Sequence, residues 1–582
     1  TGHDNTAIGA FTLNSISTGS NNVGVGASAL EANTTASGNT AVGYHSQKKT
    51  TTGSGNVSVG QNTLKNITTG NFNTAIGNAV LESNTANYNT GVGYNALLAN
   101  TTGSFNFAFG ANSMAANTTG EVNVAVANAL SANTTGNNNI AIGSNSLDTN
   151  TTGSECTAIG RGALKTSNSN ANVAVGYFAA YYTTTGTNNV GVGNSALRQN
   201  TTGANNTAIG INALTANTTA NDNTAVGYLA LTANTTGIRN TAVGSQTGDA
   251  ITTGDQNTCI GYIAGSQMTT GDDNVAVGHG ALYSITTTSD NVAVGSGAGE
   301  LTTGQLNTYV GHQAGKSATS GENSTFIGAY CASAATVTGH HNTGLGYLCM
   351  HRLTGGADNT VLGDLAAQYM TTGDKNTIVG RGVCYALSTG DENVIIGAGS
   401  GSIADTLTTG SRNVMVARNA DFGAAGRTDS LVVAAGNALV TDMGEGTSWY
   451  GAHDSGGTAG NVFRAQNEST WDTTSDRRIK KNIVDNNNGL ALLNKIQVRN
   501  FEYRTEEEIT DFPRALDVVV RSPGTKLGVI AQEVQEILPD IIEEGVEGCL
   551  SVKPDNITWY LVNAVKELKA ENDELRSLIK DS

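Results

Sequence analysis

A short alternation of apolar and small residues, closed by a glycine, returns about every 17 residues through the first three quarters of the chain. The phrase reads Asn-Thr-Ala-Val-Gly, with close variants, from Gly9 to Ala417. The residue before each glycine is apolar, as at Ile8, Val25 and Val42, and the residue two positions earlier is Thr, Val or Ile. Because side chains alternate between the two faces of a strand, each phrase predicts a short strand with one face buried.

Two corners follow each predicted strand. The glycine permits a turn with positive φ, and an Ala-Leu pair such as Ala213-Leu214 then provides a second inward-facing step. The segment Asn-Thr-Thr-Gly, for example at 200–203, supplies the next corner. A repeat this short predicts a β-solenoid whose units stack and cannot stand alone. With parallel strands about 4.8 Å apart, roughly 25 coils would form a rod on the order of 120 Å long.

A coil of this size encloses too little volume for a thick core, so a single solenoid would expose an apolar stripe along its length. Burial of that stripe against identical chains predicts a homotrimer. The residue in the middle of each strand is small in most coils but becomes large at Tyr309 and Phe326, while glycine replaces the leucine at Gly299 and Gly315. This exchange predicts that packing or chain separation changes near residue 300.

Composition supports a fibrous β protein: the 582 residues include 74 glycines and only 13% charged residues. The net charge of −17 disfavours nucleic acid as a partner, because phosphate binding needs clustered Lys and Arg. The six cysteines have no paired spacing, so we expect small buried side chains and no metal site, disulfide framework or cofactor. No apolar run is long enough to span a bilayer, and we expect no membrane insertion. The chain begins without a methionine and is expected to lack an N-terminal attachment region.

The repeat over residues 5–417 resembles the head of YadA-like trimeric autotransporter adhesins. In that family, short Ser-Val-Ala-Ile-Gly phrases build left-handed parallel β-rolls in trimers. The period here is longer, and no C-terminal membrane-anchoring segment follows. A self-anchored bacterial adhesin is therefore the less favoured interpretation.

Residues 418–474 lose the phrase and predict an irregular β region with Trp449, Tyr450 and Trp471. Aromatic residues in a chain that is otherwise poor in them are typical of a binding surface, here a receptor-binding tip. A plug that caps the trimer explains them equally well.

The character of the amino-acid sequence changes completely at Ser475. The stretch Ser-Asp-Arg-Arg-Ile-Lys-Lys-Asn (475–482) is followed by Phe-Glu-Tyr (501–503), Leu-Gly-Val-Ile-Ala-Gln-Glu-Val (527–534), Leu-Pro-Asp (538–540) and Tyr-Leu-Val (560–562). In this order the motifs resemble the endosialidase-type intramolecular chaperone, the S74 peptidase family, over residues 475–582. The resemblance implies a domain that trimerises a fibre, assists its folding and releases itself by cutting the chain.

The same resemblance implies that Ser475 is the nucleophile, that Lys480 assists it, and that the scissile bond is Thr474-Ser475. A lysine can accept a proton from a hydroxyl only when it is neutral, and neighbouring cations lower its pKa. Arg477, Arg478 and Lys481 are candidates for that surrounding.

The last segment predicts a helix with a short coiled-coil seam. One heptad position holds leucine three times, and the other holds Val, Asn and Ile; the seam is Leu561, Val565, Leu568, Asn572, Leu575 and Ile579. An asparagine at such a position fixes register and oligomer number at a cost in stability. A trimeric seam would bring three chains into register before the slow pairing of distant strands.

Together these observations predict a mainly β protein with three parts: a trimeric parallel β-solenoid shaft over 1–417, a distal β region over 418–474, and a small α+β chaperone domain over 475–582 that ends in a coiled-coil helix. The expected function is that of a bacteriophage tail fibre, made in the host cytoplasm and assembled into the virion. Its expected partners are two further copies of the chain, other tail proteins and a host cell-surface receptor, expected to be a glycan.

Other function classes remain open or are disfavoured. A glycan-depolymerising enzyme is disfavoured, because no segment outside the repeats could hold a glycosidase domain with its two carboxylates. Surface binding of ice or glycan by the repeat is an alternative, since pairs such as Thr101-Thr102 and Thr118-Thr119 would stack into a ladder. We favour the interpretation that these threonines are present because threonine is well suited to strands and corners. A trimeric bacterial surface adhesin is the other alternative.

Overall fold

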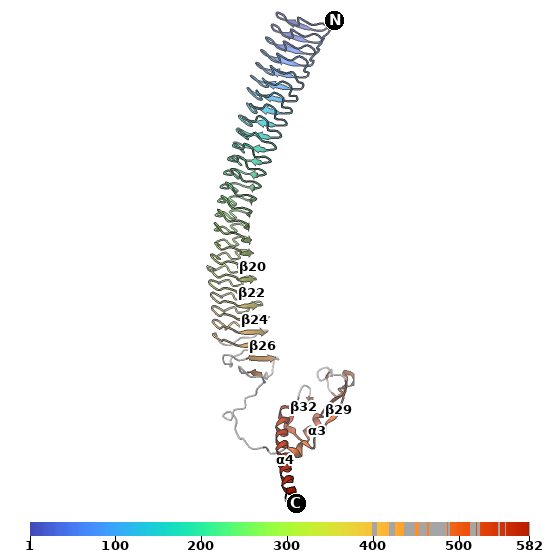
Figure 1. The fold of residues 1–582 in the computed structure, drawn as a ribbon, viewed down its shortest axis with the longest axis vertical. Helices are drawn as coiled ribbons and strands as arrows, with labels where there is room; N and C mark the ends of the chain where they lie inside the picture. The colour runs from blue at the N-terminus through green and yellow to red at the C-terminus, as the bar shows by residue number, and fades with distance from the viewer. Residues whose placement is uncertain are drawn as a thin grey trace. The chain divides into compact units, whose positions relative to one another are not determined.

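The computed structural model divides the chain into two compact units, Thr1–Thr473 and Thr474–Ser582. The first unit is the long stack of coils in Figure 1, and the second contains the helices. The structure describes residues 1–397, 404–417, 425–435, 448–452, 462–464, 486, 489–511, 520, 524–544, 548–552 and 554–580. For 448–452 and 462–464 the description covers the backbone.

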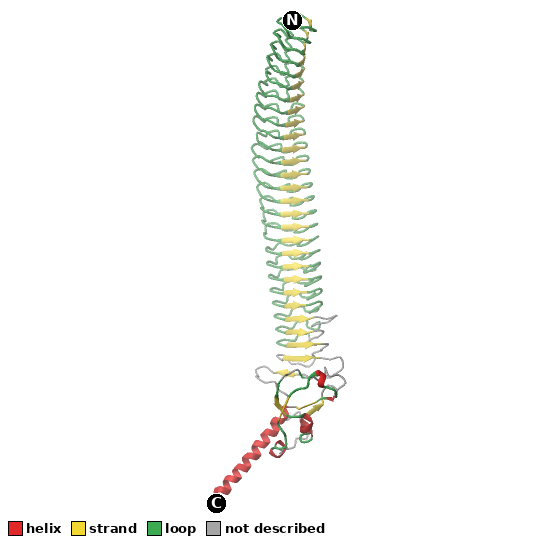
Figure 2. Ribbon diagram, turned by 90° about the vertical axis from the view of Figure 1, so that its right-hand side faces the viewer, coloured by secondary structure: helices red, strands yellow, loops and turns green. Residues whose placement is uncertain are grey.

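Each coil of the first unit contributes one short strand, and successive strands pair in parallel from β1 to β27. The pairing is in register, so that Ala208 faces Ala225 one coil further on. Figure 2 shows the strands in a single column along the stack. The predicted mainly β fold and the parallel β-solenoid are confirmed.

The strands of this sheet are β1 (Thr6–Ile8), β2 (Val23–Val25), β3 (Thr40–Val42), β4 (Val57–Val59), β5 (Thr74–Ile76), β6 (Thr90–Val92), β7 (Phe107–Phe109), β8 (Val124–Val126), β9 (Ile140–Ile142), β10 (Thr157–Ile159), β11 (Val173–Val175), β12 (Val190–Val192), β13 (Thr207–Ile209), β14 (Thr224–Val226), β15 (Thr241–Val243), β16 (Thr258–Ile260), β17 (Val275–Val277), β18 (Val292–Val294), β19 (Thr308–Val310), β20 (Thr325–Ile327), β21 (Thr343–Leu345), β22 (Thr360–Leu362), β23 (Thr377–Val379), β24 (Val394–Gly397), β25 (Val414–Ala417), β26 (Leu431–Ala435), β27 (Ser448–Ala452) and β28 (Val462–Arg464).

The interior of a coil is built from small apolar residues. In the coil that begins at Thr207, Ala208 in the middle of the strand is fully buried, as are Ala213 and Leu214 of the next side. Ile209, which precedes the glycine, points outward and is 41% exposed. The small middle residue therefore occupies the buried face of the strand, and the larger apolar residue lies on the outer face of the sheet.

The corners depend on positive φ angles. Gly210 has a φ of 138°, and a Cβ atom there would lie 2.6 Å from the carbonyl carbon of Gly227 in the next coil. Only glycine avoids this contact, as the sequence predicts. Leu214 also adopts a positive φ of 52°. The left-handed conformation costs an L-residue roughly 1–2 kcal/mol, and full burial of the leucine side chain offsets that cost.

A column of buried asparagines runs along the stack at the residue before each strand. The backbone N–H of Asn223 donates to Oδ1 of Asn206 at 3.0 Å, and Nδ2 of Asn223 donates to the carbonyl of Gly237 at 2.9 Å. Oδ1 of Asn223 accepts from the backbone N–H of Asn240 at 2.9 Å, so this residue links three successive coils and both ends of its buried side-chain amide are satisfied. Cys156 and Ser324 interrupt the column, and in each the backbone N–H still donates to the preceding asparagine.

The bulk of the core changes position late in the solenoid. Tyr309 and Phe326 fill the middle-of-strand position, are fully buried, and stack with ring centroids 5.9 Å apart. The ring of Tyr309 packs against Gly299 and Gly315, which replace the leucine of earlier coils. The predicted exchange of bulk between two inward positions is present within the chain, whereas the separation between chains stays a prediction.

The parallel ladder continues past the predicted end of the repeat at residue 417. Strand β25 pairs in parallel with β26, and β26 pairs in parallel with β27, before β28 turns back antiparallel. Ser430 takes the place of the asparagine, and its N–H donates to Oδ1 of Asn413, 17 residues earlier. The asparagine and the glycine of the phrase are lost there, but the spacing that stacks the strands is kept.

The second unit is a small α+β fold. Its elements are α1 (Leu490–Leu493), β29 (Arg499–Phe501), η2 (Glu506–Glu508), β30 (Lys526–Gly528), α3 (Ala531–Gln535), η3 (Pro539–Ile541), β31 (Ile542–Glu544), β32 (Leu550–Val552) and α4 (Pro554–Lys580). Two antiparallel pairs, β29·β30 and β31·β32, accompany the long helix α4, which confirms the predicted C-terminal helix.

Candidate functional sites

The second unit has its own core, formed where α3 and η3 meet the N-terminal half of α4. Val534, Leu538 and Ile541 are buried beside Tyr560, which is 8% exposed. The hydroxyl of Tyr560 donates to Oδ2 of Asp540 at 2.6 Å, and this hydrogen bond raises the pKa of Tyr560. The motif Leu-Pro-Asp therefore ties η3 to the helix.

The short helix α1 is fastened to the same face of α4. The backbone N–H of Leu490 donates to Oε2 of Glu567 at 2.6 Å, which satisfies an otherwise open donor at the helix start. A Cβ atom at Gly489 would lie 2.6 Å from the carbonyl carbon of Asn563, so only glycine permits this approach. These contacts hold Gly489 and the start of α1 against α4.

The predicted self-cleavage residues lie just upstream of these contacts. Thr474, Ser475 and Lys480 all fall outside the described residues, as do the neighbouring cations. Their roles stay predictions. The boundary between the two compact units, after Thr473, lies one residue before the predicted scissile bond.

All six predicted seam residues lie in α4. Within one chain their apolar members are open to solvent: Leu561, Val565, Leu568 and Leu575 are 50–65% exposed. The inward face of the helix instead carries Tyr560 and Ala564. The helix therefore has one face that packs on its own unit and one apolar face that does not. Ile579 and Asn572 continue the second face toward the C-terminus.

The predicted tip residues are only partly placed. Trp449 and Tyr450 lie in β27, where their backbones are in register with Val432 and Val433 of β26. Their side chains and the whole of Trp471 lie outside the described residues. Both interpretations, a receptor-binding tip and a capping plug, remain predictions.

The predicted apolar stripe runs along the outer face of the solenoid sheet; we call it the outer stripe. It consists of the exposed or half-exposed apolar residues at the last outward position of the strands, before the glycine or the alanine that replaces it, including Ile8, Val59, Ile76, Phe109, Ile142, Ile159, Ile209, Val243, Ile260, Val294, Leu345, Ile396, Val416 and Val433. Exposed apolar residues repeated in this way are the feature from which the sequence predicts burial against identical chains, and that burial stays a prediction.

The threonine ladder is also present, and its hydroxyls are used inside the solenoid. Oγ1 of Thr101 donates to the carbonyl of Thr118 at 2.9 Å, and Oγ1 of Thr118 donates to the carbonyl of Thr134 at 3.0 Å. The first threonine of each pair thus bonds to the next coil. This geometry favours the structural interpretation of the pairs over an ice-binding surface.

One feature was missed at the level of sequence. The coil of β11 carries the aromatic cluster Tyr177, Phe178, Tyr181 and Tyr182, and adjacent coils place cations over its rings. The signal was available, because the residues at 177–182 are the densest aromatic stretch in a chain with only 5% aromatic residues.

Five of the six cysteines are buried, and Cys549 is partly exposed. Burial raises the pKa of the Cys259 thiol to about 12, so this group stays protonated. Among the described residues no three His, Cys, Asp or Glu side chains are grouped to hold a metal ion. No helix in the described ranges is long and apolar enough to cross a membrane.

Residues 475–543 match the Peptidase_S74 family model, described as the chaperone of endosialidase. The match begins at Ser475 and extends to β31 of the second unit. It confirms the resemblance drawn from the C-terminal motifs. The chain therefore joins a long parallel β-solenoid to an endosialidase-chaperone segment, a combination consistent with a tail-fibre-like protein.

Proposed function

We propose that this chain is a subunit of a trimeric, receptor-binding bacteriophage tail fibre whose C-terminal chaperone assists its folding and then cleaves the chain at Thr474-Ser475. The observation that carries the proposal is the position of the chaperone match, which starts at Ser475, two residues after the last residue of the first compact unit, Thr473. A cut at that bond would separate the two compact units and leave the shaft whole.

The chemistry of the cut follows from where the nucleophile stands. Ser475 follows the scissile bond, so attack of its Oγ on the carbonyl carbon of Thr474 breaks the peptide bond and forms an ester. The freed amine of Ser475 takes up a proton, and water then hydrolyses the ester to the Thr474 carboxylate. Lys480 is proposed to accept the hydroxyl proton during the attack, which requires it to be neutral.

Two apolar surfaces support assembly into a trimer. The outer stripe runs along the solenoid, and the seam face of α4 lies exposed in the second unit. Three copies would bury both kinds of surface at once, which a monomer cannot do. The seam would align the chains first, and the strands would stack afterwards.

A trimeric bacterial surface adhesin and a solenoid whose repeat surface binds ice or glycan remain the alternatives. The chaperone match favours a fibre over an adhesin. The threonine hydroxyls that bond between coils leave fewer groups to order an ice surface.

The test is the intact mass of the purified wild-type chain beside Ser475→Ala. We expect separation of the wild type at Thr474-Ser475 and an uncut variant. Ser577→Ala, on the exposed part of α4, is the matched control and should be cut normally. An uncut wild type would withdraw the roles of Ser475 and Lys480 and leave the module as a structural cap.

A further inference from the structure

The aromatic cluster of the β11 coil lies among three cations. Arg161 and Lys165 come from the coil before it, and Arg198 comes from the coil after it. The guanidinium carbon of Arg198 lies 5.4 Å from the ring centroid of Phe178, and Nζ of Lys165 lies 5.4 Å from that of Tyr181. In a chain with a net charge of −17, this is a local concentration of positive charge beside aromatic faces.

The cluster is held in place by packing. Phe178 and Tyr181 meet edge to face with centroids 4.9 Å apart, and Tyr181 meets Tyr182 in the same way at 4.6 Å. Beneath them, a Cβ atom at Gly162 would lie 2.7 Å from Cδ1 of Phe178. The ring of Phe178 therefore packs directly on the backbone at Gly162, where any side chain would collide with it. Tyr182 is 44% exposed and lies at the solvent side of the cluster.

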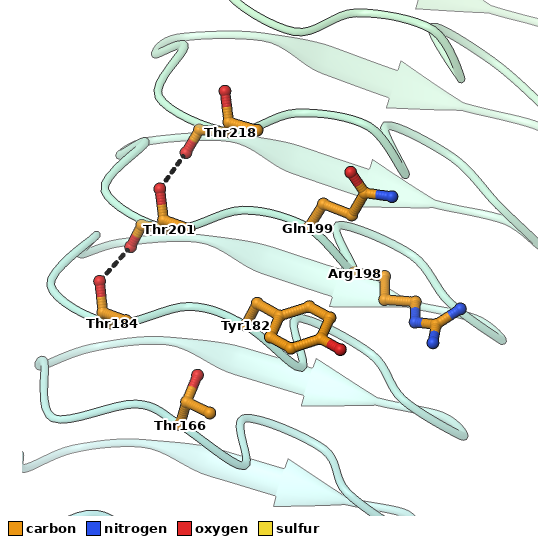
Figure 3. A pocket seen from close by; sticks show the side chains of 7 residues that line it. All are labelled: Thr166, Tyr182, Thr184, Arg198, Gln199, Thr201 and Thr218. Atoms are coloured by element: carbon orange, nitrogen blue, oxygen red, sulfur yellow. Dashed lines mark hydrogen bonds between the residues drawn. The ribbon is translucent and has the colours of Figure 1, made fainter.

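A groove opens beside Tyr182 and crosses four coils. Its lining combines one aromatic ring, one cation, one amide and a row of hydroxyls, as Figure 3 shows: Thr166, Tyr182, Thr184, Arg198, Gln199, Thr201 and Thr218. Its volume of about 480 Å³ lies in the range of small-ligand sites.

Arg198 has unused hydrogen-bonding capacity at this groove. Within the part of the chain that the structure describes, its buried Nε has no hydrogen-bond partner. A guanidinium offers planar pairs of donors that fit a carboxylate. The threonine hydroxyls at the groove wall are anchored, since Oγ1 of Thr184 donates to the carbonyl of Thr201 and Oγ1 of Thr201 donates to that of Thr218. Their lone pairs remain available as acceptors.

The groove lies on a different side of the solenoid from the outer stripe. Tyr182 and Arg198 follow the inward Ala-Ala and Ala-Leu steps of their coils, at 179–180 and 196–197, whereas the stripe is formed by the strands. Figure 3 shows the strands behind the labelled side chains. Assembly through the outer stripe would therefore leave the groove open to solvent.

We propose that this groove on the shaft binds a carboxylated saccharide of a cell-surface glycan, with Arg198 pairing with the carboxylate and Tyr182 providing a face for the sugar ring. This inference rests on the proposed function as a receptor-binding fibre and places a binding site on the shaft. Gln199 and the threonine hydroxyls bond to the sugar hydroxyls. Three clustered cations are too few for tight binding to a long polyphosphate, which needs many phosphate contacts.

The test is a glycan array that carries uronate-terminated and sialate-terminated glycans beside their neutral counterparts, probed with the full purified protein. We expect binding to be confined to acidic glycans and to weaken by roughly tenfold or more in Arg198→Gln and Tyr182→Ala. The matched controls are Arg239→Gln and Tyr228→Ala, which change an exposed arginine and an exposed tyrosine in other coils. Both should bind as the wild type does.

Any of three results would overturn the inference. They are binding to neutral glycans alone, undiminished binding by Arg198→Gln, and no binding to any acidic glycan. Tighter binding of a single-stranded oligonucleotide than of every glycan would also overturn it. The intact-mass comparison with Ser475→Ala tests the proposed self-cleavage independently of glycan binding. Normal self-cleavage without glycan binding rejects the groove alone, whereas an uncut wild type counts against the proposed fibre.

Discussion

The ring of Tyr309 occupies the space that a side chain at Gly299 would need, since a Cβ atom there would lie 2.6 Å from Cδ2 of the ring. Gly315 packs against the same ring from the following coil. The hydroxyl of Tyr309 remains satisfied in the core through a 3.3 Å contact with Oγ1 of Thr302. A single aromatic residue therefore replaces two leucines as the filling of this part of the solenoid.

This packing predicts that Gly299→Leu destabilises the shaft, because two side chains would compete for one volume and position 299 has a φ of 55°. Tyr309→Ala should cost about 3–5 kcal/mol through the cavity it leaves. The double variant Tyr309→Ala/Gly299→Leu should recover part of the loss. Thermal unfolding of the four proteins provides the comparison, and a double variant that is less stable than both single variants would contradict this packing.

The asparagine column predicts that replacing a buried asparagine lowers the stability of the solenoid far more than replacing an exposed polar residue does. Asn223→Ala leaves the backbone N–H of Asn240 without its acceptor and should destabilise the solenoid by about 1–3 kcal/mol. Asn223→Ser should cost less, because Ser324 and Ser430 already stand in the same column. The exposed Thr219→Ala is the control and should be close to neutral. Equal midpoints of urea unfolding for Asn223→Ala and Thr219→Ala would show that the column contributes no stability.

The pair Tyr560–Asp540 predicts a pH dependence in the second unit. The hydrogen bond raises the pKa of Tyr560 above its unfolded value, so its contribution is fully present below about pH 10 and is lost as the pH rises through the folded pKa. Tyr560→Phe should lower stability at pH 8 by about 1 kcal/mol and remove this alkaline loss. Because the helices of the described residues belong to the second unit, the circular dichroism signal at 222 nm during urea unfolding reports mainly on that unit. An identical pH profile in Tyr560→Phe would reject the assignment.

The seam face of α4 predicts that assembly fails when its apolar contacts are replaced by charge. Leu568→Lys should prevent trimer formation while leaving the core around Val534 and Tyr560 folded, because Leu568 is 53% exposed in the single chain. Glu574→Lys changes charge on the outer side of the same helix, away from the seam and its flanking positions, and is the control. Asn572→Leu should raise stability and weaken the choice of oligomer number. Gel filtration with light scattering separates these outcomes, and a trimeric Leu568→Lys would reject the seam.

Much of the shaft could be predicted from sequence because one rule repeats. The apolar residue, the small residue and the glycine determine strand, interior and corner in each coil, and the positive φ of Gly210 follows from its place directly after the strand. The sequence does not predict the parallel strand β26, because Ser430 stands where earlier coils have the asparagine. The 17-residue spacing to Asn413 is nevertheless retained.

The groove beside Tyr182 could not be predicted by examining one coil. Lys165, Tyr181 and Arg198 belong to three coils, and only the stacking register brings them together. The helix α4 was predicted from its heptads, but its inward face was not, because Tyr560 and Ala564 are buried by tertiary contacts with η3 and α1.

The central claim is that three copies of this chain assemble into one fibre, and its most direct test is the mass of the assembled protein in solution. Sedimentation equilibrium of Ser475→Ala, which keeps shaft and chaperone in one chain, should give three times the chain mass of 59.3 kDa. A folded, soluble monomer at micromolar concentration would contradict the account, because the outer stripe and the seam of α4 would then both remain exposed.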